Sequence, residues 1–166
     1  MHRDLDISKY SGVSVNGDVY TFPLWNLVGE MVGYQQYRAN ANKERKENPK
    51  DMRYFTYMSR RGTNTAWGLE ALDTSKRYCV LVEGAFDAVK LHNSGINALA
   101  VLANNPKPLR SWLRSWGFHL VAICDGDAAG EKLATLGDTV EHLPKGFDVG
   151  DLSAKCVEQM FGKYAC

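Results

Sequence analysis

Residues 79–87 read CVLVEGAFD: an apolar run that ends abruptly in a glutamate, a glycine and, three residues later, an aspartate. Residues 121–127, VAICDGD, repeat the pattern about forty residues further on. Continuous aliphatic runs are typical of buried parallel strands, and in open α/β sheets the functional groups gather beyond the carboxyl ends of the strands. The two runs therefore predict an α/β fold with four acidic side chains on one rim of a parallel sheet. These acids are Glu83, Asp87, Asp125 and Asp127.

Carboxylates gathered in this way suit Mg2+, which takes oxygen ligands and usually keeps waters and substrate phosphates beside one or two carboxylates. Each acid alone is also compatible with a structural role, because acids in a first helical turn complement the helix dipole. A third acidic step, from Asp148 to Asp151, follows the next short apolar patch, and this repetition favours a metal site. Asp125 and Asp127 flank a glycine that permits close ligand approach, so they are predicted as direct ligands, with Asp87, Asp148 and Asp151 completing the cluster.

Three segments carry a resemblance to a known family. VEGAFDA at 82–88, DGDAAG at 125–130 and FDVGDL at 147–152 resemble the three signatures of the Toprim domain, which DnaG-type primases, topoisomerases and several nucleases share. Asp87 four residues after Glu83, Gly130 closing the second motif and a D-x-x-D-L third motif are most similar to the primase branch, especially phage primases and primase-helicases. The resemblance implies a mostly parallel sheet flanked by helices, and a general acid/base or metal-organising role for Glu83.

The resemblance extends upstream, and the order of the matches supports the primase branch. Segments 19–24 (VYTFPL), 33–38 (GYQQYR), 53–54 (RY) and 67–69 (WGL) resemble the strand-rich N-terminal part of primase polymerase cores, with Arg53 in place of a lysine and Trp67 in place of a tyrosine. In all, the resemblance covers roughly residues 17 to 155. It implies a small, mainly antiparallel β (α+β) subdomain over residues 1–76, followed by a Toprim domain over residues 77–166.

The implied activity is that of a DNA primase catalytic core: Mg2+- or Mn2+-dependent synthesis of short RNA primers from ribonucleoside triphosphates on single-stranded DNA, in phage DNA replication. Two alternatives keep the same fold. One is a metal-dependent Toprim nuclease, and the other is a non-catalytic Toprim protein that binds a replication component. The resemblance also implies a replicative helicase as partner.

Charge is divided along the chain, although the formal net charge is only +1. Residues 38–61 include eight basic and three acidic residues, whereas residues 119–151 include seven acidic residues and two lysines. A metal site opposite a phosphate-binding wall would have this distribution. The candidate nucleotide or template contacts are Arg38, Arg53, Arg60 and Arg61, together with Asn104 and Asn105 in the loop after the second parallel strand.

The composition and the N-terminal residues argue against a membrane-spanning or secreted protein. In 166 residues with 45% hydrophobic and 23% charged side chains, no apolar run approaches the roughly 20 residues of a membrane span. The N-terminus lacks the apolar core of a secretion signal, so a cytoplasmic location without membrane contact is the expectation. The four cysteines form no C-x-x-C pair, so a zinc-binding module would have to be separate.

Periodicity predicts the order of elements. Asn16-Gly17 predicts a hairpin turn between short antiparallel strands, and Tyr54 to Met58 reads as a further strand. From residue 77 onward strands over 78–82, 97–102, 119–124 and 139–143 alternate with helices over about 85–94, from 106 or 108 onward, 127–137 and 151–161.

Overall fold

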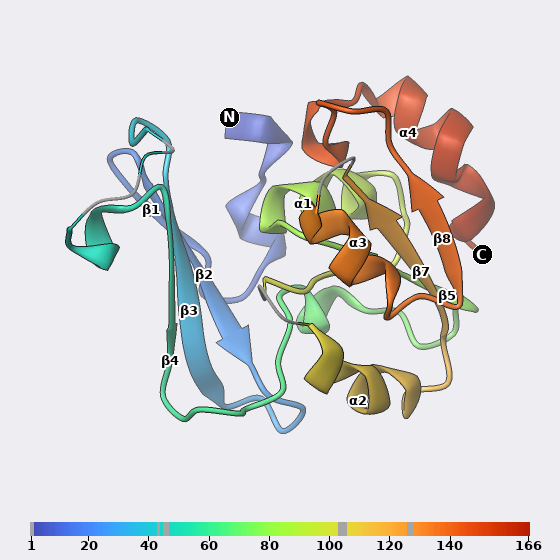
Figure 1. Cartoon of the computed structure of the whole chain (residues 1–166), viewed down its shortest axis with the longest axis horizontal. Coiled ribbons are helices and arrows are strands. Elements are labelled where there is room, and N and C mark those ends of the chain that lie inside the picture. The colour runs from blue at the N-terminus through green and yellow to red at the C-terminus, as the bar shows by residue number, and fades with distance from the viewer. Residues whose placement is uncertain (1, 43, 45–46, 103–105, 126–127) are drawn as a thin grey trace.

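The computed structural model describes residues 2–42, 44, 47–102, 106–125 and 128–166. The described part of the chain contains two four-stranded sheets, together with helices and short turns. Figure 1 shows the antiparallel sheet on the left and the parallel sheet with its helices on the right, with the N-terminal turns between them. The α/β class, with an antiparallel sheet preceding a helix-flanked parallel one, is confirmed.

The antiparallel sheet is a meander in which each strand pairs with the next. Its strands are β1 (Ser14–Asn16), β2 (Val19–Trp25), β3 (Met31–Arg38) and β4 (Tyr54–Met58). The predicted Asn-Gly turn joins β1 to β2, where Gly17 has a φ of 60° that glycine adopts without strain. Side chains alternate between the faces of β3: Gln35 and Tyr37 are buried against the rest of the molecule, whereas Tyr34 and Gln36 lie on the outer face.

The second sheet is parallel throughout, in the order β6-β5-β7-β8. Its strands are β5 (Tyr78–Val82), β6 (Ala98–Ala100), β7 (His119–Cys124) and β8 (Thr139–His142). The α-helices are α1 (Ala85–Asn93), α2 (Arg110–Arg114), α3 (Ala128–Ala134) and α4 (Ala154–Phe161). Short 3-10 turns cover His2–Asp4, Ile7–Lys9, Pro49–Asp51, Leu69–Ala71, Lys107–Leu109, Val149–Asp151 and Gly162–Tyr164.

Strand alternation divides the core between the two faces of the parallel sheet. Val80 and Val82 pack with α1, α4 and the inner face of the antiparallel sheet. Phe86 of α1 and Phe22 of β2 belong to this cluster. Cys79 and Leu81 point the other way and pack with α2 and α3. One apolar cluster therefore joins the antiparallel sheet to α1 and fixes the two sheets relative to each other. The division into subdomains at residues 76 and 77 stays a prediction.

Several elements are shorter than predicted, and the start of the last helix differs most among those that have a structural reason. The last helix begins at Ala154, not at residue 151, because the Ser153 side chain accepts a hydrogen bond from the Cys156 N–H at 3.2 Å and caps the helix there. The third acidic motif consequently forms a separate 3-10 turn, Val149–Asp151, capped by Asp148. In the described part of the chain, no helix is long and apolar enough to cross a membrane.

Candidate active site

Glu83 and Asp125 follow two adjacent parallel strands and lie at the carboxyl-terminal rim of the sheet. Leu81 of β5 pairs with Ala122 of β7, so Glu83 and Asp125, which follow the two strands, emerge at the same rim, one residue out of register with each other. A cleft of about 480 Å³ lies at this rim. Its acidic lining residues are Glu83, Asp87, Asp125 and Asp148. The predicted gathering of strand-end acids is thus present in the geometry, while their functional roles stay predictions.

Gly130 allows α3 to begin directly against the end of β7. A Cβ atom added at Gly130 would lie 2.2 Å from the backbone oxygen of Asp125, a distance that no side chain can occupy. The glycine that closes the second motif therefore has a steric reason: it lets the helix approach the strand end that carries Asp125.

Asp87 is the most constrained acid of the cluster. It is 9% exposed, and its two carboxylate oxygens accept hydrogen bonds from the Gly84 N–H at 3.1 Å and the Gly150 N–H at 2.9 Å. The side chain thereby ties the first acidic motif to the third. Burial, followed by the charges of Asp148 and Asp125, raises the pKa of Asp87 to about 7 against the two hydrogen bonds. Each of these oxygens keeps a second lone pair beside its backbone hydrogen bond, so the two contacts orient the carboxylate without using up its capacity to accept.

Asp87 should make the metal-free protein less stable as the pH rises. Because its folded pKa of about 7 lies above the unfolded value of 3.8, the folded state binds the extra proton, and the stability that this proton supplies is lost as the pH rises towards and through about 7. Between pH 5 and pH 8 the free energy of unfolding of the wild type should fall, relative to that of Asp87→Asn, by about 2–3 kcal/mol.

Urea denaturation in EDTA at the two pH values measures this difference. Glu158→Gln, which removes an exposed acid on α4, is the control and should follow the wild type. Parallel pH profiles for wild type and Asp87→Asn would contradict the raised pKa.

The third acidic motif faces a cation from the other end of the chain. Asp148 caps its own turn by accepting the Asp151 N–H at 2.9 Å. Arg3, in the N-terminal turn, places Nη1 3.9 Å from Asp148 and Nη2 3.6 Å from Asp151. The sequence carried no signal for this contact, because only the tertiary fold brings residue 3 to the third motif.

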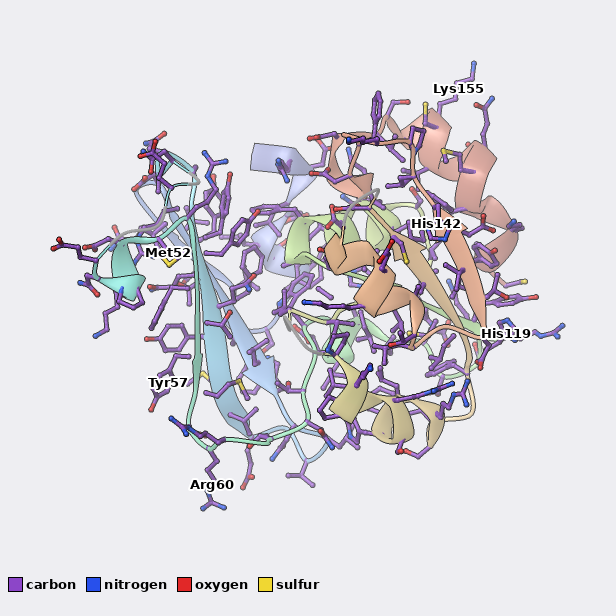
Figure 2. The ribbon with its side chains drawn as sticks, in the orientation of Figure 1. Met52, Tyr57, Arg60, His119, His142 and Lys155 are labelled. Carbon is purple, nitrogen blue, oxygen red and sulfur yellow. The ribbon has the colours of Figure 1, made fainter. Side chains whose placement is uncertain are left out.

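The basic residues predicted from sequence lie in three different places. Arg53 lines the cleft, and its Nε donates to the Ala41 carbonyl oxygen at 2.6 Å. Arg38 belongs to the outer face of the antiparallel sheet, where it donates to Gln36 at 3.1 Å. Arg60 and Arg61 occupy the exposed turn after β4; Figure 2 shows Arg60 at the end of that strand, remote from Met52 near its start. The structure therefore brings only Arg53 of these four to the acidic cleft.

Three predicted site residues, Asn104, Asn105 and Asp127, lie outside the described residues. Conversely, the cleft includes residues that sequence reasoning did not single out as site residues. They are Arg3, Gln35, Tyr37, Tyr54, Phe86 and Lys132, among others. Lys132 lies one helical turn after Ala128, the first residue of α3, a spacing that could have indicated it. Tyr37 and Tyr54 form a ring pair with centroids 5.1 Å apart on the wall opposite the acids.

The donor set fits a hard cation. Carboxylate oxygens converge on the cleft, and the one nearby thiol is poorly suited to bind metal: burial, followed by the charges of Glu83 and Asp125, raises the pKa of Cys124 to about 11. Among the described residues, no three Asp, Glu, His or Cys side chains come together closely enough to hold a metal ion. Mg2+ needs only one or two protein carboxylates beside water and substrate phosphate, so the oxygen-lined cleft suits it.

No protein-family model and no curated protein matches the sequence. Solved structures do match in fold. The RNA polymerase domain of Mycobacterium tuberculosis primase DnaG aligns with a TM-score of 0.63 at 22% identity, over 89% of this chain and 54% of that one. A DNA primase domain from Pseudomonas aeruginosa gives 0.61 at 20% identity, over 86% and 47%. The primase fragment of the bacteriophage T7 primase-helicase protein gives 0.58 at 15%, over 95% and 65%.

The chain spans about half the length of the two bacterial primase domains. Two further matches hold nucleic acid: the M. tuberculosis domain in complex with double-stranded DNA, and a DnaG primase catalytic domain bound to single-stranded DNA. At identities near 20% such likeness establishes the fold alone. The chain has the fold of DnaG-type and phage primase catalytic cores.

Proposed function

We propose that the chain is the catalytic core of a DNA primase that makes short RNA primers on single-stranded DNA with the help of Mg2+ or Mn2+. One observation carries the proposal: strand-end acids line a cleft whose opposite wall holds Arg53 and an aromatic pair, within the primase catalytic-core fold. Acids at a sheet rim would suit many metal enzymes. The basic and aromatic wall facing them favours a polyanionic substrate.

In this proposal a 3'-hydroxyl attacks the α-phosphorus of a ribonucleoside triphosphate, the hydroxyl proton is lost, and the bond to the β-phosphate breaks to release pyrophosphate. A divalent cation would lower the hydroxyl's pKa and neutralise charge on the leaving group. Asp125 and Asp127 would hold the cation, with Asp148 and Asp151 nearby. Glu83 would position the cation or accept the proton, and Asp87 would keep the first and third motifs together through its two backbone contacts.

Arg53 and Lys132 would contact the triphosphate, since both line the cleft, whereas Arg3, which also lines it, lies beside Asp148 and Asp151. Arginine suits this task because its planar guanidinium offers paired donors to phosphate oxygens. Asn104 and Asn105 stay predicted nucleotide contacts. A replicative helicase, a separate zinc-binding module and a phage origin remain part of the proposal as the sequence resemblance implies them, and a cytoplasmic location is proposed with them.

The template would continue over the outer face of the antiparallel sheet. Tyr34 and Tyr57 have ring centroids 5.4 Å apart on that face, and Figure 2 shows Tyr57 pointing away from the parallel sheet. Exposed rings beside arginines suit single-stranded nucleic acid, whose bases stack on aromatic side chains while its phosphates meet the cations. Arg38 lies on the same face, and Arg60 and Arg61 lie at its end.

Primer synthesis tests the proposal directly. Purified protein is incubated with single-stranded template, labelled ribonucleotides, and Mg2+, Mn2+ or EDTA. Short RNA products that require the cation would support the primase, whereas degradation of the template would support the nuclease. Neither product, with intact template binding, would support the non-catalytic alternative.

The double substitution Arg60→Ala, Arg61→Ala should weaken binding of single-stranded DNA and reduce its salt dependence. Each phosphate contact on a single strand contributes about −0.7 to the slope of log K against log salt, so the slope should become shallower by about 1.4. Fluorescence anisotropy with a labelled oligonucleotide at several salt concentrations measures it.

Lys155→Ala is the matched control, because it removes an exposed positive charge on α4, on the other side of the molecule (Figure 2). Its slope should equal that of the wild type. An unchanged slope in the arginine double variant would mean that the turn after β4 contacts only solvent.

A further inference from the structure

The N-terminal turn places a cation against the acidic cluster. Besides its contacts at 3.9 and 3.6 Å to Asp148 and Asp151, the Arg3 guanidinium lies over the Phe86 ring, 5.6 Å from the centroid. A Cβ atom added at Gly150 would come within 3.4 Å of Nη1, so the guanidinium lies close to the glycine of the third motif. Arg3 thus lies inside the cleft, beside residues of the first and third acidic motifs.

Several contacts hold the turn in place. Lys90 of α1 forms an ion pair with Asp4 at 2.5 Å, Asn93 donates to the Asp4 carbonyl oxygen at 3.0 Å, and the next residue, Leu5, is completely buried. Arg3 and Asp4 both adopt left-handed backbone conformations, with φ of 48° and 60°. Aspartate tolerates this region, whereas it is unfavourable for a long side chain such as that of Arg3. Such strain persists only where the surroundings impose it, and it is most common at functional sites.

The ion pairs of Arg3 offer little stability in return. Both distances exceed hydrogen-bonding range, and about 30% of the Arg3 and Asp148 side chains and 56% of the Asp151 side chain remain exposed. Loose, partly solvated pairs of this kind contribute little to folding and exchange readily. The strained placement therefore calls for a role other than stability, and the neighbouring charges indicate one.

We propose that Arg3 is a built-in counter-charge that competes with the divalent cation for the acidic cluster, and so sets the cation affinity of the site. This inference rests on the proposed function in one respect, that the cluster binds a metal. Without a cation, the carboxylates lining the cleft repel one another, and the guanidinium offsets that repulsion. When a cation enters, a fixed positive charge a few ångströms away opposes its binding until Arg3 withdraws.

Binding of Mn2+ to the full chain, followed by the loss of the free-ion paramagnetic resonance signal, tests the competition. Arg3→Met, which keeps the length of the side chain without its charge, should bind Mn2+ at least ~5-fold more tightly than the wild type at low salt. Arg3→Lys should remain within about twofold of the wild type, since it keeps the charge. The gain in Arg3→Met should shrink in 0.5 M salt, because ions screen partly exposed charges.

Lys155→Met is the control, because it removes an exposed charge on α4 away from the cleft. Its Mn2+ affinity should equal that of the wild type. An Arg3→Met affinity equal to or weaker than that of the wild type would overturn the inference, as would an equal gain in Lys155→Met or a lack of Mn2+ binding in every protein. Thermal unfolding in EDTA checks that each variant is folded. If Arg3→Met does not fold, Arg3→Lys still tests the inference. An Mn2+ affinity of Arg3→Lys well away from the wild-type value would also overturn the inference.

The same experiments separate this inference from the proposed function. If the Mn2+ series behaves as expected but no primers are made, the counter-charge role stands and the primase activity falls. If primers are made with Mn2+ while Arg3→Met binds the ion like the wild type, the primase stands and the role of Arg3 falls.

Discussion

The substitution Asp125→Asn is expected to abolish cation-dependent ribonucleotide incorporation while leaving the protein folded. Asp125 ends β7 and lines the cleft, so an amide at this position keeps the shape of the side chain but not the charge that would hold a cation. Removing the charge should also relieve repulsion, since Asp125 contributes to the raised pKa of Asp87. The metal-free variant should therefore be at least as stable as the wild type.

Two measurements on one preparation check both parts. Primer yield in Mg2+ should fall to the level seen in EDTA, and the upward shift of the melting temperature on adding Mg2+ should disappear. Glu158→Gln, on the exposed side of α4, should retain both the yield and the shift. Wild-type yield from Asp125→Asn would remove this residue from the metal site.

The sequence predicts most of the parallel sheet, because its evidence is local. The apolar runs before Glu83 and Asp125 are short and each is followed by a glycine, which favours buried strands over helices, and β7 spans residues 119–124 as predicted. Gly95 ends α1 with a φ of 70°, as a helix-terminating glycine should. The Asn16-Gly17 pair likewise predicted the position of the turn between β1 and β2.

What the sequence leaves open depends on contacts between distant segments. The hydrogen bond from Gly150 to Asp87 joins residues 63 positions apart, and no local pattern distinguishes an acid that ties two motifs together from one that faces a ligand. Arg53 and Arg60 both read as basic residues near aromatic ones, yet only Arg53 lines the cleft, because β4 carries the turn after it to the other end of the sheet. Arg3 belongs to the site only because α1 anchors the N-terminal turn.

The substitution Glu83→Gln should separate an enzyme from a binding protein. Glu83 follows β5, one of the two inner strands, and lines the cleft. It also lies close to Cys124, whose pKa is raised by burial and then by the charges of Glu83 and Asp125. Glutamine has the same shape but can neither accept a proton at neutral pH nor hold a cation by charge. Losing a general acid/base typically costs a factor of 10² to 10⁴, so incorporation should fall by ~100-fold or more.

Template binding supplies the internal control for this variant, because Arg53 and the outer face of the antiparallel sheet are untouched. Anisotropy with single-stranded DNA should give the wild-type affinity and salt slope, so the loss would lie in catalysis and not in folding or recruitment of the template. A non-catalytic protein would show no incorporation in either form, with equal DNA binding. Robust synthesis by Glu83→Gln would contradict the catalytic role of Glu83, although not the fold. Because the variant changes nothing else in the cleft, another group would then have to accept the proton.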